Sequence, residues 1–115
     1  MSNEPIPGRN ARLIVAPLAR ADEDFQVRLL IQHPMETGFR RDVDGNVLAA
    51  NLLESLSLDF DGQPVFNALT MNALTANPFL TFVVAIKRSG QFNARWRDMK
   101  GNVGSISASV RVVAA

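Results

Sequence analysis

Apolar and polar residues alternate with a period of two along most of the chain, in short runs separated by turn-forming residues. Such alternation is typical of strands that bury one face and expose the other to water. It predicts strands over residues 12–16, 25–32, 56–60, 65–66, 79–87, 92–97 and 106–112. About seven short strands with intervening turns predict an all-β fold, an immunoglobulin-like β-sandwich.

The ends of the strands carry turn signals. Asp61-Gly62 tolerates positive φ and predicts a β-hairpin between residues 56–60 and residues 65–66. Ser89-Gly90 predicts a second turn. The residues expected in the core are the apolar members of the alternating runs: Val27, Leu29, Ile31, Phe60, Phe82, Val84, Trp96, Ala108 and Val110.

One stretch, residues 47–60, fits two patterns. Leu48, Leu52 and Leu56 lie at helical spacing, whereas residues 56–60 alternate as in a strand. We interpret the first part as an extended lead-in to the strand. A helical turn before the strand is the alternative.

Length and charge limit the classes of function. A chain of 115 residues, 47% of them hydrophobic, has room for one core of useful size, so we expect a single domain over residues 11–115. Residues 1–10, with two prolines and a glycine, are expected to form a mobile N-terminal arm. The 12 Lys+Arg nearly balance the 11 Asp+Glu and are scattered, which argues against a nucleic-acid partner.

The apolar runs are too short for a membrane protein. The longest, residues 79–86, is far below the roughly 20 residues that span a bilayer. The N-terminus lacks the apolar core and cleavage site of a secretory signal, so we expect no leader in this chain.

Few side chains offer chemistry for a metal or a nucleophile. The sequence has no cysteine and one histidine, His33, which excludes cysteine nucleophiles and zinc sites built on cysteine or paired histidines. The string "DVDGN" at residues 42–46 resembles the start of a calcium loop, but Gly45 is fourth instead of sixth and Leu53 occupies position twelve. We therefore interpret it as a tight turn and expect no metal and no cofactor.

A catalytic role is one alternative for the polar residues. His33, Glu36 and Asp98 could support acid–base chemistry with a serine or threonine hydroxyl, as in a small hydrolytic enzyme. A working triad also needs mutual orientation and an oxyanion site, for which the sequence gives no sign. We expect no catalytic residue and interpret His33 as a structural loop histidine.

The string "HPMETGFRRD" begins with residues that set a backbone shape. Pro34 favours an extended conformation at His33, and Gly38 permits positive φ. Glu36 can pair with the two arginines that follow, although surface ion pairs contribute little. The stretch is therefore either a solvated connection between strands or a recognition loop with a preset shape.

Three motifs resemble those of SoxZ, a family of subunits of the sulfur-oxidation carrier complex. They are "HPMETGFRRD" at residues 33–42 followed by Gly45, "NPF" at residues 77–79, and "WRDMKG" at residues 96–101. The resemblance covers residues 12–113 in the same order, and the HPMETG string is highly specific.

The resemblance implies an immunoglobulin-like sandwich that forms a heterodimer with a SoxY-type subunit. In that family the partner holds sulfur intermediates covalently on a cysteine of a glycine-rich C-terminal segment during thiosulfate oxidation, and other Sox enzymes make transient contacts. The present chain, which lacks cysteine, would be the non-catalytic subunit. A periplasmic location is also implied, reached together with the partner on the partner's twin-arginine signal.

The two motif loops are the expected contact regions for the SoxY-type subunit, its C-terminal segment or the visiting enzymes. The residues are His33, Pro34, Met35, Glu36, Thr37, Gly38, Asn77, Pro78 and Phe79. Without a partner, the same surface would favour a homodimer. A SoxYZ-like carrier in a different pathway, for example beside a quinoprotein dehydrogenase, is compatible with the same sequence.

Overall fold

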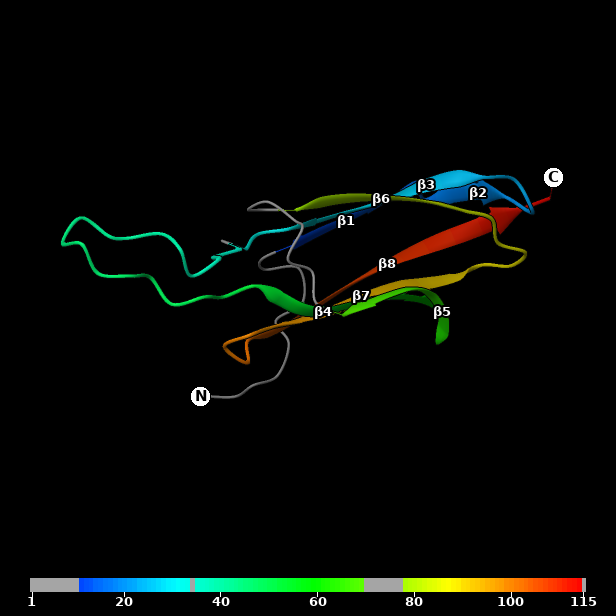
Figure 1. The fold of residues 1–115 in the computed structure, drawn as a ribbon. Helices are drawn as coiled ribbons and strands as arrows, with labels where there is room; N and C mark the ends of the chain where they lie inside the picture. Colours follow the sequence, from blue (N-terminus) through cyan, green and yellow to red (C-terminus); the bar gives the residue numbers. More distant parts are fainter. Residues whose placement is uncertain (1–10, 34, 70–77, 115) are drawn as a thin grey trace.

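The computed structural model describes residues 11–33, 35–69 and 78–114, which form a sandwich of two β-sheets (Figure 1). The strands are β1 (Ala11–Val15), β2 (Leu18–Arg20), β3 (Phe25–Ile31), β4 (Leu53–Phe60), β5 (Gln63–Leu69), β6 (Phe79–Val84), β7 (Gly90–Asp98) and β8 (Val103–Val113). The all-β sandwich predicted from the alternation is confirmed. Within the described ranges, no helix has the length and apolar character needed to cross a membrane.

One sheet has three antiparallel strands in the order β1-β3-β6. Its central strand follows the predicted period of two. Val27, Leu29 and Ile31 are fully buried on the inner face, whereas Gln26 and Arg28 are exposed on the outer face.

The other sheet has five strands in the order β2-β8-β7-β4-β5. The predicted hairpin joins β4 to β5, and positive φ at both Asp61 (49°) and Gly62 (84°) fits the twist of the two strands. The strand β2 was not predicted, and with it the described residues contain eight strands, close to the expected number of about seven. With three residues β2 is too short to show a period of its own, and it is fixed by parallel pairing with β8.

The core between the sheets contains most of the residues predicted for it. Five are buried, namely Val27, Leu29, Ile31, Trp96 and Val110. Three more are partly buried and pack against that cluster, namely Phe60, Phe82 and Val84. Ala108 is half-buried and pairs with Phe92 across β7 and β8. Trp96 lies against Gly104, where an added Cβ would overlap the indole ring, so this glycine makes room for the tryptophan.

Between β3 and β4 the chain leaves the sandwich and returns (Figure 1). We call residues 35–52 the extension. Two antiparallel bridges, Glu36↔Asn51 and Arg41↔Val47, hold its two limbs side by side. Residues 47–52 contain no helical turn, which confirms their interpretation as an extended lead-in to β4.

The far end of the extension is closed by a tight turn, as predicted for "DVDGN". Oδ1 of Asp42 accepts hydrogen bonds from the backbone N–H groups of Asp44 (2.9 Å) and Asn46 (3.0 Å). Gly45 has a φ of 83° and donates its N–H to the carbonyl of Asp42. The carboxylate of Asp42 therefore stabilises the turn.

Candidate functional site

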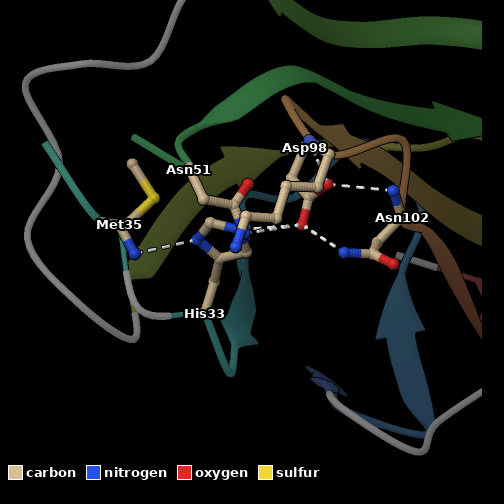
Figure 2. A network of polar contacts seen from close by, with 6 residues as sticks. His33, Met35, Asn51, Asp98 and Asn102 are labelled. Carbon is tan, nitrogen blue, oxygen red and sulfur yellow. Dashed lines mark hydrogen bonds and ion pairs between the residues drawn. The ribbon is translucent and has the colours of Figure 1, made fainter. Parts of the chain in front are cut away.

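Polar side chains converge where the extension meets the sandwich (Figure 2). We call this cluster the extension base: His33, Asn51, Asp98 and Asn102. The exposed fractions of His33, Asn51 and Asp98 are 7%, 7% and 3%. The base therefore joins the end of β3, the returning limb of the extension and the end of β7 through a polar network in which Asn102 is the exposed member.

The imidazole of His33 has a partner at each ring nitrogen. The backbone N–H of Met35 donates to Nδ1 at 3.0 Å, so the proton of the neutral ring lies on Nε2. Nε2 then donates to Oδ2 of Asp98 at 3.2 Å. In this arrangement His33 links two strands that are far apart in the sequence.

The carboxylate of Asp98 accepts five hydrogen bonds. Oδ2 accepts from His33, from Nδ2 of Asn51 (3.3 Å) and from Nδ2 of Asn102 (3.0 Å). Oδ1 accepts from the backbone N–H groups of Lys100 (3.0 Å) and Asn102 (2.9 Å). Burial alone would raise the pKa of Asp98, but the hydrogen bonds from Asn102, His33 and Asn51 together outweigh it and hold the pKa below its ordinary value of 3.8.

The turn between β7 and β8 brings the donors of Lys100 and Asn102 to Asp98. The backbone of Asp98 pairs with Asn102 (N–H to carbonyl, 2.9 Å) and with Gly101, whose φ of 82° favours glycine. The backbone N–H of Met99 donates to the carbonyl of Leu52 at 2.9 Å. The turn and the extension are therefore joined by main-chain contacts as well as by the base.

Asn51 connects the base to the extension. Its backbone exchanges two hydrogen bonds with Glu36, at 2.8 and 2.7 Å, while its side chain reaches Asp98. Its Oδ1 is buried and has no hydrogen-bond partner in the part of the chain that the structure describes. Among the described residues this is the one buried side-chain atom left unpaired in an otherwise saturated cluster.

Two residues of the first limb have positive φ. Gly38, at 91°, behaves as predicted, and a Cβ there would stand 3.2 Å from that of Ala50. Met35, at 49°, is unusual for a residue with a side chain, and it is 5% exposed. Its N–H bond to His33 helps to stabilise this conformation.

Glu36 and Arg40 form the local ion pair that the sequence allowed. The guanidinium of Arg40 donates three hydrogen bonds of 2.6 to 3.1 Å to the carboxylate of Glu36. This bonding lowers the pKa of Glu36 and raises that of Arg40. The structure thus brings His33 and Asp98 together but directs Glu36 toward Arg40, so the three candidates for acid–base chemistry do not form one site.

The predicted contact residues lie at one end of the sandwich. The N–H of Ile31 donates to the carbonyl of Pro78 at 3.0 Å, and Phe79 pairs with Leu30, which places the second loop beside the end of β3. Three of the predicted residues are buried, namely His33, Met35 and Pro78. Two are partly buried, namely Glu36 and Gly38, and two are exposed, namely Thr37 and Phe79. Pro34 and Asn77 lie outside the described residues.

Residues 39–47, the extension tip, expose apolar side chains that sequence analysis missed. The exposed fractions of Phe39, Val43 and Val47 are 91%, 101% and 55%. They have no strand or helix period. The sequence does contain one sign of them: large apolar residues stand within a charged stretch rich in turn formers, where a surface loop would usually have polar residues.

A pocket of about 660 Å³ lies at the other end of β4, between the β4–β5 turn and the segment after β6. Its lining is mainly apolar, with charged side chains at Asp61, Lys87 and Arg88. None of the residues at the extension base contributes to it. Among the described residues no group of three or more metal-ligating side chains is found.

Several solved structures share this fold. Superoxide reductase (neelaredoxin) from Ignicoccus hospitalis has a TM-score of 0.69 at 20% identity, covering 91% of this chain and 81% of that chain. A putative superoxide reductase from Thermotoga maritima has a TM-score of 0.67 at 17% identity, covering 90% and 85%. The sulfur carrier protein SoxY from Chlorobium limicola f thiosulfatophilum has a TM-score of 0.65 at 8% identity, covering 94% and 83%. At these identities the likeness concerns the fold.

The sequence comparisons are more specific. No curated protein matches the chain. The profile of the family described as sulphur oxidation protein SoxZ matches residues 14–109, which run from β1 into β8 and include the extension and its base. The chain therefore belongs to the SoxZ family.

Proposed function

We propose that this chain is the non-catalytic subunit of a SoxYZ-type sulfur carrier. It pairs with a SoxY-type subunit that holds sulfur intermediates covalently on a cysteine during thiosulfate oxidation. The observation that carries the proposal is the family match over residues 14–109. The absence of cysteine from the sequence assigns the covalent chemistry to the partner.

The geometry of the base supports a role without catalysis. Asp98 is saturated by five hydrogen bonds, and both ring nitrogens of His33 have partners. A general base needs a lone pair directed at substrate, and neither group offers one in this arrangement. The network instead fixes the position of the extension relative to β7.

Partner contact is proposed for the two motif loops, with a division of work between their residues. Thr37 and Phe79 are exposed and can touch a SoxY-type subunit directly. His33 and Met35 are buried, so they act by holding the first limb in its conformation. The exposed residues of the loops therefore contact the partner, and the buried residues hold them in position.

The pairing is tested by producing the chain with and without a SoxY-type subunit from a sulfur-oxidation gene cluster. We expect a one-to-one heterodimer by size-exclusion chromatography with light scattering at micromolar concentration. Separate elution of the two subunits would contradict the proposal. The isolated chain, given thiosulfate, should show no turnover above background, and a rate that disappears in His33→Ala would favour an enzyme.

The proposed location is the periplasm, which the chain reaches in complex with its partner. Fractionation of cells that produce both subunits tests this, with the twin-arginine signal of the partner intact or deleted. We expect this chain in the periplasm only in the first case. Periplasmic recovery in both cases would show that the partner does not carry it.

A further inference from the structure

We propose that the extension tip is the main anchor for the SoxY-type partner, which buries the side chains of Phe39 and Val43. This inference rests on the proposed function and names a surface outside the expected contact residues 33–38 and 77–79. It is carried by the exposure of these side chains and by the internal bonding that holds the tip out from the sandwich.

The apolar residues of the tip are not covered by the rest of the described chain. Phe39 and Val43 are 91% and 101% exposed, the highest values among the large hydrophobic residues of the described chain. Single exposed apolar residues are ordinary, but three large ones within residues 39–47 are a concentration of exposed apolar surface on one short segment, and such concentrations mark interaction sites. An aromatic side chain that a partner buries is a typical energetic hot spot.

Three charged side chains of the tip, those of Arg40, Arg41 and Asp42, are bonded within the extension. The guanidinium of Arg40 donates hydrogen bonds to the carboxylate of Glu36, and that of Arg41 donates to the carbonyl of Gly45 at 2.7 Å. The carboxylate of Asp42 caps the turn. Because these charged groups are bonded within the extension, the apolar side chains can be buried by a partner without stripping partners from them.

The conformation of the extension is held by bonds within this chain. Two bridges pair its limbs, and the base anchors them to β3 and β7. A preformed element loses little conformational entropy on binding, so more of the contact energy appears as affinity. The internal bonding therefore has a function in recognition that a plain connection between strands would not need.

The size of the extension fits an anchor within a larger interface. From the bridge at Glu36 to the start of the turn at Asp42 it reaches roughly 20 Å, at about 3.3 Å per residue. A stable interface takes about 800 Å² from each partner, and a buried aromatic side chain supplies roughly 150–250 Å² of it. The tip is thus the central contact, and exposed residues nearer the sandwich, such as Thr37 and Phe79, complete the area.

A second copy of the chain is a poorer occupant than a SoxY-type subunit. The pocket described above lies at the Phe60 end of β4, whereas the extension leads into the Leu53 end of the same strand. Insertion of the tip into the pocket of another copy would be head-to-tail and would build open chains. A SoxY-type subunit, which is a different protein, can bind the tip and form a closed heterodimer.

An anionic lipid surface is also a poorer occupant, because Asp42 and Asp44 stand on either side of Val43.

The experiment compares variants of the tip with a control elsewhere on the surface. Phe39→Asp and Val43→Asp are combined in one variant, and Leu18→Asp on β2 is the control, since Leu18 is apolar and 57% exposed. Binding to the purified SoxY-type subunit is measured by calorimetry. We expect the tip variant to bind at least about 30-fold more weakly and the control to bind within about threefold of the unmodified chain. Equal thermal melting of the three proteins verifies that the sandwich is intact.

A second readout uses the absence of native cysteine. Val43→Cys carries a single thiol, which is alkylated rapidly in the isolated chain. We expect the complex to slow this reaction at least tenfold, with Leu18→Cys unaffected.

If the unmodified chain binds the partner but the tip variant binds equally well and Val43→Cys stays reactive, the anchor is elsewhere and only this inference fails. If the unmodified chain does not bind the partner, the proposed function fails. Protection of Val43→Cys by self-association or by anionic vesicles, without protection by the partner, would also overturn the inference.

Discussion

The base and the tip of the extension have opposite relations to water, although His33 and Asn51 of the base lie only a few residues from the tip in the sequence. At the base, histidine, asparagine and aspartate are buried and bonded to one another. At the tip, phenylalanine and valine are exposed. Each end reverses the usual preference of its residue types. A buried polar network costs desolvation and gives a unique geometry, whereas an exposed apolar patch becomes favourable when a partner covers it.

The difference separates two kinds of contribution to function. Changes at the base should alter the stability of the isolated chain, because its hydrogen bonds exist there already. Changes at the tip should alter binding without altering stability. The following measurements test this division, from the largest expected effect to the smallest.

Trp96 sets the scale for a disruption of the sandwich itself. It is 9% exposed and lies two residues before Asp98 on β7. Trp96→Ala should lower the free energy of unfolding by about 3–5 kcal/mol, the usual cost of truncating a large buried aromatic residue. Urea denaturation followed by circular dichroism gives the value. A loss near zero would mean that the indole adds little to the core.

Asp98 is the central residue of the base, and its removal leaves five donors without their acceptor. Asp98→Ala should cost about 3 kcal/mol, because each buried unpaired donor costs roughly 1–3 kcal/mol and some will find water. Asp98→Asn keeps one acceptor oxygen and should cost less. Denaturation at neutral pH measures both variants. Equal losses of unfolding free energy would show that hydrogen bonding to the side chain at position 98 does not contribute to stability.

The same carboxylate predicts an effect of pH. The folded pKa of Asp98 lies below the ordinary 3.8, so the unfolded chain binds a proton at this group more readily than the folded chain does. Its contribution to stability is therefore fully present above pH 3.8 and is lost as the pH falls through the folded value. Asp98→Asn should flatten the fall in unfolding free energy below pH 4 relative to the unmodified chain. Parallel curves for the two proteins would show that Asp98 does not titrate differently on folding.

Sequence patterns predicted the sandwich better than they predicted the extension. The period of two located β3, β4, β7 and β8 because each has one face in the core over many residues. It missed β2, whose position depends on a parallel neighbour 93 residues away: Leu18 pairs with Arg111, and 111 − 18 = 93. Short strands fixed by distant pairing leave no local trace.

The candidate site was only partly visible for a similar reason. Residues 33–38 were singled out by their motif, but the contact between His33 and Asp98 spans 65 positions. No local rule predicts such a pair. Nor did the motif indicate that His33 would be buried while Phe39, six positions later, would be exposed. The direction in which each side chain points depends on the backbone of Met35 and Gly38, both of which have positive φ.

The smallest expected effect concerns the same substitution at two valines. Val110 on β8 is 3% exposed and Val43 at the tip is fully exposed. Val110→Ala removes two methyl groups from the core and should cost about 2 kcal/mol of unfolding free energy. Val43→Ala removes them from water and should change that free energy by no more than about 0.5 kcal/mol. Denaturation of both variants of the isolated chain gives the comparison. A loss at Val43 as large as that at Val110 would mean that the tip is packed in solution, and its apolar side chains would then be part of the fold and unavailable to a partner.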